Sequence, residues 1–303
     1  MNARLSIEHT TQYAYDHDVI LAQHLAYLRL QSTPWQKVLQ HALIVTPEPS
    51  HLDEQIDAFG NHRSYFSLTQ PHRALTVHST SAVEKTPRYD QFNTGATQPW
   101  ELVRNAMVYS LEQPFVPASE FVWPSPYVAW HESLKNYALT AFTPGRPLGE
   151  ASLALCQQIY NDFTYESGST QIHTPIEVAF NARKGVCQDF AHIMIGCLRT
   201  LGLAARYVSG YLLTTPPAGQ PRLRGADASH AWVSVYCPEA PGHWLELDPT
   251  NATLADIDHV CIAQGRDFGD VSPLRGIIRG GGQHRLEIAV TVEPSQANHQ
   301  PVG

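Results

Sequence analysis

A helix pattern that begins at a cysteine is the strongest local signal in this chain. From Cys187 onward, apolar side chains recur at helical spacing, and Gly202 marks the end of the pattern. A thiol at the start of a helix faces unpaired backbone N–H groups and the positive end of the helix dipole, and both favour the thiolate. The same N–H groups would stabilise an oxyanion on a substrate carbonyl. Position alone leaves two interpretations of Cys187 open: a nucleophile or a buried structural cysteine.

Two strand patterns downstream carry a histidine and an aspartate at matching ends. Residues 227–236 have the pattern of a strand with His230 near its start, and residues 244–251 have the pattern of a strand that ends at Asp248. If these strands are antiparallel neighbours, His230 and Asp248 lie at the same end of a sheet. His230 would then take the proton of the Cys187 thiol, and Asp248 would orient the imidazole. The sequence therefore predicts a Cys, His, Asp order with gaps of 43 residues (230 − 187) and 18 residues (248 − 230).

Four motifs in this order resemble the core motifs of bacterial transglutaminase-like proteins, which belong to the papain-like cysteine-enzyme superfamily. The motifs are GVCQDFAH at 185–192, ARYVSGYL at 205–212, DASHAW at 227–232 and LDPTN at 247–251. Carried over residue by residue, the family's nucleophile falls on Cys187, its base on His230 and its orienting acid on Asp248. In related enzymes an upstream side chain joins the cysteine N–H as an oxyanion donor. Tyr165 is the nearest candidate here, and an aromatic core residue is the other interpretation of Tyr165.

The chain is expected to have an α+β fold, because helix patterns precede the strand patterns of the core instead of alternating with them. The helix starting at Cys187 would pack across the antiparallel sheet that carries His230 and Asp248. Helices are expected at 100–113, 127–139 and 148–163. Strand alternation and the resemblance together predict an N-terminal antiparallel, sandwich-like β domain at 1–95. A helical and Pro-rich connector at 96–145, a transglutaminase-like catalytic core with a closing C-terminal strand at 146–294, and a tail at 295–303 complete the predicted organisation.

Composition excludes several classes of partner. The 303 residues carry a net charge of −8 and no Lys/Arg-rich run, which argues against a nucleic acid or an anionic membrane. The first 15 residues hold no apolar signal segment and no run of 18 apolar residues occurs, so the expected location is the cytoplasm. Five cysteines without close pairs do not form a disulfide framework, and they suit a reducing compartment.

No metal or cofactor is expected. The chain contains neither a His-Glu-x-x-His nor a Cys-x-x-Cys motif. On the predicted helix, Cys187, His192 and Cys197 follow one another at steps of five residues. Each step turns about 140° around the helix, so the three side chains cannot face one ion.

The resemblance implies a cysteine-dependent enzyme that attacks a peptide or protein amide and passes through a thioester. Hydrolysis, as in a cysteine protease or amidase, is favoured over transfer to an amine, as in a protein-glutamine gamma-glutamyltransferase. A non-enzymatic scaffold, with the N-terminal domain as the surface for a protein partner, is the competing class. Two local alternatives stay open: residues 213–227 either wall the cleft or only connect strands, and Trp232 either shields His230 and Asp248 or fills the core. The substrate, the acyl acceptor and the oligomeric state are not predicted.

Overall fold

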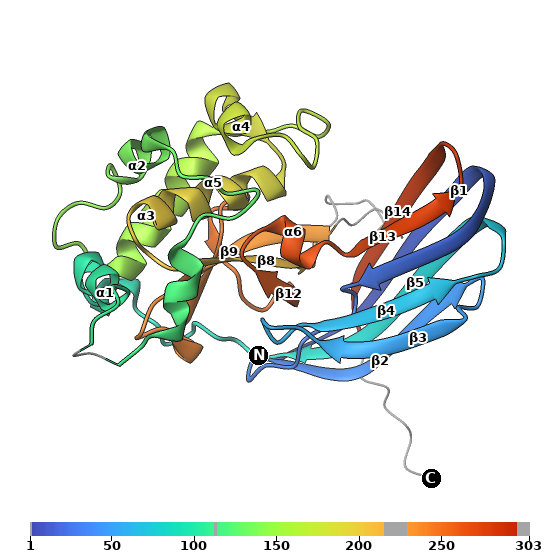
Figure 1. Cartoon of the computed structure of the whole chain (residues 1–303). Coiled ribbons are helices and arrows are strands. Elements are labelled where there is room, and N and C mark those ends of the chain that lie inside the picture. Colours follow the sequence, from blue (N-terminus) through green and yellow to red (C-terminus); the bar gives the residue numbers. More distant parts are fainter. Residues whose placement is uncertain (1, 112–113, 215–228, 296–303) are drawn as a thin grey trace, which may run out of the picture.

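The protein has the predicted α+β fold, described by a computed structural model for residues 2–111, 114–214 and 229–295. A curled antiparallel sheet forms one half of the molecule, and helices packed on a second sheet form the other (Figure 1). The strands are β1 (Ala3–Ala26), β2 (Gln36–Thr46), β3 (His51–Ile56), β4 (His62–Leu68), β5 (His72–Lys85), β6 (Thr164–Tyr165), β7 (Lys184–Gly185), β8 (Ala205–Leu212), β9 (Ser229–Tyr236), β10 (Trp244–Asp248), β11 (Thr253–Leu254), β12 (His259–Gly265), β13 (Leu274–Gly280) and β14 (His284–Pro294). The α-helices are α1 (Trp100–Ala106), α2 (Glu132–Ala138), α3 (Leu148–Asp162), α4 (Ile176–Ala182), α5 (Cys187–Thr200) and α6 (Phe268–Val271).

The N-terminal sheet is built around one long strand, β1. Its seven strands follow the order β2-β5-β1-β4-β3, with β13 and β14 also paired to β1. Along its first half β1 pairs with β5 and β14, and along its second half with β4 and β13. Alternate residues of β5, such as Leu75 and Val77, are fully buried, as a strand with one face on a core requires. The prediction that a closing strand at the end of 146–294 completes the catalytic core is wrong, because β13 and β14 join the N-terminal sheet instead.

The second sheet is antiparallel and has the strand order β11-β10-β9-β8-β12. Helix α5 packs across it against β8 and β9, and α2, α3 and α4 pack against α5. The α5 side chains from Phe190 to Leu198 are all buried, which explains the strong helix pattern of this segment. The expected antiparallel pairing of the strands that carry His230 and Asp248 is confirmed by the register of β9 and β10, in which Val233 lies opposite Leu247.

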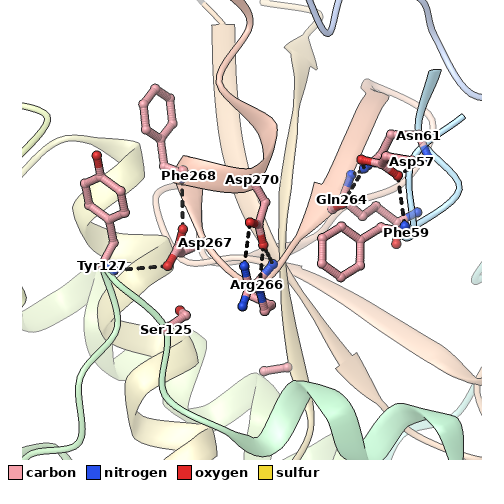
Figure 2. Close-up of polar contacts among 12 residues, drawn as sticks. Asp57, Phe59, Asn61, Ser125, Tyr127, Gln264, Arg266, Asp267, Phe268 and Asp270 are labelled. Carbon is pink, nitrogen blue, oxygen red and sulfur yellow. Dashed lines mark hydrogen bonds and ion pairs between the residues drawn. The ribbon is translucent and has the colours of Figure 1, made fainter. Parts of the chain in front are cut away.

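Side chains from the N-terminal sheet close the outer edge of β12. The Gln36 amide donates to the Cys261 carbonyl at 2.7 Å and accepts the Cys261 N–H at 2.9 Å. The Asn61 amide donates to the Gln264 carbonyl at 2.7 Å and accepts the Gln264 N–H at 2.8 Å. Figure 2 shows Asn61 together with Gln264 and Asp57. Both amide side chains are buried. Each replaces the two backbone bonds that a neighbouring strand would have made, and the two halves are thereby joined.

The predicted helices exist, but some boundaries differ. The helix expected at 100–113 ends at Ala106, and the one expected at 127–139 begins only at Glu132. Helix α3 ends one residue before the predicted boundary, and the short α4 was not predicted. In the described part of the chain, no helix combines the length and the apolar character that a membrane crossing requires.

Candidate active site

Cys187 is the first residue of α5, and its neighbours fix that position. Asp189 folds back so that its Oδ2 accepts the Val186 N–H at 2.8 Å and the Thr170 hydroxyl at 2.6 Å. A side chain at residue 185 would collide with this carboxylate, because a Cβ on Gly185 would lie 2.6 Å from Asp189 Oδ2. Asp189 therefore has the structural role that its place in the first helical turn indicates. The turn leaves the Cys187 thiol partly exposed at the start of the helix.

His230 lies between Cys187 and Asp248. Its Nε2 donates a hydrogen bond to Asp248 Oδ2 at 2.7 Å, and its ring lies beside the Cys187 thiol in the same cavity. Because Nε2 is used by Asp248, Nδ1 is the nitrogen left for the thiol. Burial disfavours charge on the ring, but the hydrogen bond to Asp248 and the nearby Cys187 outweigh burial and raise the pKa of His230 to about 10. The structure thus brings together the three side chains that the sequence analysis selected.

Asp248 is fully buried and accepts hydrogen bonds from four donors. Its Oδ2 accepts from His230, from His259 Nε2 at 3.0 Å and from the Asn251 amide at 2.6 Å, while Oδ1 accepts the Thr250 N–H at 2.9 Å. Burial disfavours the carboxylate, yet the hydrogen bonds from the two imidazoles outweigh it and hold the pKa of Asp248 well below its ordinary value. His259 was not selected from the sequence, although it begins the buried strand β12 and His230 is the second residue of β9.

The same buried group has the residue types of a metal site. The ligand atoms of His230, Asp248 and His259 lie within 4.8 Å of one another. Both imidazoles use Nε2 to donate to one carboxylate oxygen, so an ion would have to replace these hydrogen bonds. The group is more consistent with an ionised Asp248 that orients His230, and the absence of a metal cofactor stays a prediction.

Trp232 lies beside His230 and fills the core. Its ring stacks near the His230 ring, with centroids 6.2 Å apart, and its indole N–H donates to Glu246 at 2.9 Å. The side chain is fully buried against Gly210, where a Cβ would lie 2.3 Å from the indole ring. The core interpretation of Trp232 is therefore confirmed, and shielding of His230 and Asp248 stays a prediction.

A cavity of about 280 Å³ opens onto Cys187 and His230. One wall comes from the half of the molecule that carries α5, and a second wall comes from β1, β13 and β14 of the N-terminal sheet. Within this second wall, His9 is buried and bonded to the Tyr211 hydroxyl at 2.7 Å and to Thr11 at 3.1 Å. Burial lowers the pKa of His9 to about 4, so the ring is neutral near pH 7. The residues that the N-terminal sheet contributes to the lining are His9, Thr11, Tyr13, Leu274, Leu286 and Ile288.

Phe268 completes the cavity from the segment that follows β12. Its N–H donates to His192 Nε2 at 3.2 Å, and burial keeps His192 able to accept by lowering its pKa to about 3. The preceding residue, Asp267, accepts the Tyr127 N–H at 3.0 Å, and Arg266 forms an ion pair with Asp270 (Figure 2). The segment is thus held by hydrogen bonds to α5 and to Tyr127, and no sequence pattern marks it as part of a site.

Tyr165 lies beside the nucleophile but not among the residues that line the cavity. Strand β6 pairs in parallel with β7, which sets Tyr165 opposite Gly185, two residues before Cys187. The ring packs against Phe190 and is 52% exposed. Burial and the nearby Cys187 charge both raise the pKa of Tyr165, so the hydroxyl stays protonated and able to donate. Its role at an oxyanion remains a prediction. Most of the predicted loop 213–227 lies outside the described residues.

Two family models match the chain. The bacterial transglutaminase-like N-terminal region matches residues 5–84, and the transglutaminase-like superfamily model matches residues 137–249. An uncharacterized protein of Mycobacterium tuberculosis is 41% identical over 300 residues, which are 97% of this chain and 94% of that one. A protein-glutamine gamma-glutamyltransferase of Pseudomonas aeruginosa is 40% identical over 72 residues, 23% of this chain and 10% of its own.

A solved structure has the same architecture. The crystal structure of a candidate cysteine protease from Cytophaga hutchinsonii superposes with a TM-score of 0.73 at 22% sequence identity. The match covers 99% of this chain and 93% of that one, so the fold is shared from the N-terminal sheet to β14. Together, the family models, the full-length relative and the common fold identify the chain as a member of the bacterial transglutaminase-like family, within the transglutaminase-like superfamily.

Proposed function

We propose that the protein is a cysteine-dependent acyl-transfer enzyme that acts on peptide or glutamine-type amide bonds. The observation that supports the proposal is that Cys187 and His230 line one cavity while His230 is hydrogen-bonded to the buried Asp248. A partly exposed thiol at a helix start, with a base beside it, has the requirements of nucleophilic catalysis.

The reaction would proceed in two halves. His230 takes the thiol proton as sulfur bonds to the amide carbon, and the Cys187 N–H with the Tyr165 hydroxyl stabilises the resulting oxyanion. The imidazolium then gives its proton to the departing nitrogen, the C–N bond breaks and a thioester remains. In the second half an acceptor attacks the thioester carbon and loses its proton to His230. The C–S bond breaks, and the thiol is regenerated.

Water is the acceptor that we propose, which makes the enzyme a peptidase or amidase. The alternative is an amine acceptor, as in a transglutaminase. The similarity to the Pseudomonas aeruginosa gamma-glutamyltransferase supports this alternative. The five free cysteines fit a reducing compartment, so the proposal includes a cytoplasmic location.

Alkylation by iodoacetamide near neutral pH tests the nucleophile. The thiols other than Cys187 are buried, and burial raises their pKa values, so one thiol should react in a fast phase. C187A should remove this phase, H230N should slow it, and C261S, which removes a buried thiol, should leave it intact. Equal and slow reaction of all five thiols would exclude the enzyme and favour a scaffold.

Mass spectrometry separates the two acceptors. The protein is incubated with peptide amides that contain glutamine, with and without a primary amine. Chain cleavage or loss of ammonia indicates hydrolysis, and a mass gain equal to the amine minus ammonia indicates transfer. A chelator should leave either activity unchanged. Loss of activity with chelator would instead point to an ion at His230, Asp248 and His259.

A further inference from the structure

Strand β14 runs beside the cavity, and along residues 284–289 no described strand pairs with its outer edge. It pairs with β1 along its whole length, from Leu5 opposite Pro294 to Tyr15 opposite His284. Among the described strands β1 is its sole partner. Residues 284–289 of β14 are exposed. The outer edge of this stretch is therefore a place where backbone groups lack a strand partner within the described residues.

The hydrogen bonds at both ends of the β1–β14 ladder show which residues face outward. The Ser295 N–H donates to the Arg4 carbonyl at 2.8 Å, and the Asp16 N–H donates to the Gln283 carbonyl at 3.1 Å. Antiparallel pairs alternate between hydrogen-bonded and non-hydrogen-bonded types. Odd-numbered residues of β14 consequently bond to β1, and even-numbered residues direct their N–H and C=O groups away from it. Pro294, which has no N–H, occupies an even position as this alternation requires.

Leu286 and Ile288 combine this outward backbone with side chains in the cavity. Both line the same cavity as Cys187 and His230, and they are 45% and 54% exposed. Their partners on β1, Tyr13 and Thr11, line it as well. An apolar wall and a row of open backbone groups thus meet at the entrance to the proposed catalytic cavity.

We infer that β14 at Leu286 and Ile288 is a docking edge for the substrate, which binds as an added antiparallel or parallel strand. The inference rests on the proposed function and narrows its substrate class to an extended polypeptide segment, as opposed to a free amino-acid amide. An open strand edge bonds best to another backbone, and the apolar wall accepts alternate side chains of that segment. The outward N–H and C=O groups of residues 286 and 288 are two residues apart, so every second residue of the bound segment should form backbone hydrogen bonds with β14.

Peptide binding to the C187A variant tests the inference without any turnover. The probe is the acetylated hexapeptide amide Thr-Val-Gln-Leu-Thr-Ser, measured by calorimetry. I288P removes one outward N–H and keeps the bonds to β1, while I288A removes the side chain alone. A lost hydrogen bond contributes about 0.5–1.5 kcal/mol, so I288P should bind roughly 2- to 12-fold more weakly than I288A. H284P, at an even position outside the cavity lining, is the matched control and should bind like its parent.

A second measurement is independent of the folding of any proline variant. N-methyl groups are placed at each amide of the hexapeptide in turn, and binding to C187A should weaken at alternate positions only. Equal binding by I288P and I288A, or no alternation along the peptide, would overturn the inference. The inference would also be overturned if the parent protein formed a dimer and I288P were monomeric, because the edge would then pair with a second copy of the chain. Failure of the proposed chemistry would appear separately, in the alkylation of Cys187.

Discussion

Asp248 receives more hydrogen bonds than the orientation of one imidazole requires. Three of its four donors converge on Oδ2, the oxygen that also holds His230. Donors that share this negative charge leave less of it to act on His230. His259 is thus a positioning residue: it fixes the carboxylate and moderates the affinity of His230 for its proton.

Replacing His259 by phenylalanine should raise the pKa of His230 further, so that an imidazolium stays beside Cys187 up to a higher pH. Removal of a buried donor also costs about 1–3 kcal/mol of unfolding free energy. The pH profile of Cys187 alkylation measures the first effect, and its imidazolium limb should move to higher pH. H259Q keeps a hydrogen-bond donor, so its imidazolium limb should lie between those of the parent and H259F. His24→Phe is the control, because His24 is equally buried but lies in the N-terminal sheet against Phe66. A profile of H259F identical to the parent's would contradict this role.

At the residue scale, the sequence predicted those side chains whose positions follow from local patterns. Cys187 begins a helix, His230 is the second residue of a strand and Asp248 ends one, and each boundary has its own signal. His259 and Phe268 have no such signal of function. The position of His259 follows from the pairing of β12 with β8, and that of Phe268 follows from the fold of the segment after β12. Each of these arrangements brings together residues that are distant in the chain.

At the element scale, the edge of β12 shows how two side chains can take the place of a strand. Replacing Asn61 by leucine would leave the buried N–H and C=O of Gln264 without these partners. An unsatisfied buried group costs about 1–3 kcal/mol, so N61L should lower the unfolding free energy by roughly 2–6 kcal/mol. Urea denaturation measures this loss. Asn105→Leu, on an exposed stretch of chain, should change it little, and an equal effect of both variants would contradict the explanation.

The sequence predicted elements better than their partners. Helix α5 and the β9–β10 pair were recognised because hydrophobic period and turn residues define them within about 60 residues of chain. The association of β13 and β14 with β1 was missed, since strands from opposite ends of the chain carry no local mark of their pairing. Helix α4 was missed although α1 and α2, which have the same length of seven residues, were recognised.

For the whole molecule, buried neutral histidines should set the acid limit of stability. Burial lowers the pKa of His9 and His24 to about 4 and that of His192 to about 3. Each pKa lies below the unfolded value of about 6.5, so unfolding takes up protons below that pH. Their contribution is complete above about pH 6.5 and is lost as the pH falls. His230, with its pKa raised to about 10, acts in the opposite direction and loses its contribution as the pH rises through that value.

Urea midpoints at pH 7 and pH 5 check this prediction. Each neutral histidine adds about 1.4 kcal/mol per pH unit to the loss, so the three together add roughly 4 kcal/mol per unit. H24F removes one of the three histidines and should therefore remove about one third of that pH dependence. The substitution breaks no hydrogen bond, because neither ring nitrogen of His24 has a partner among the described residues. An unchanged midpoint between the two pH values would contradict it.

The amide bridges of Gln36 and Asn61 have a consequence for proteolysis and for the dissection of this protein. A fragment that starts near residue 96 would retain Cys187, His230 and Asp248 but would carry a bare rim along β12. Such rims recruit other chains and promote aggregation. The half that holds the thiol is therefore expected to precipitate when it is produced alone, and co-expression with residues 1–95 should return it to solution.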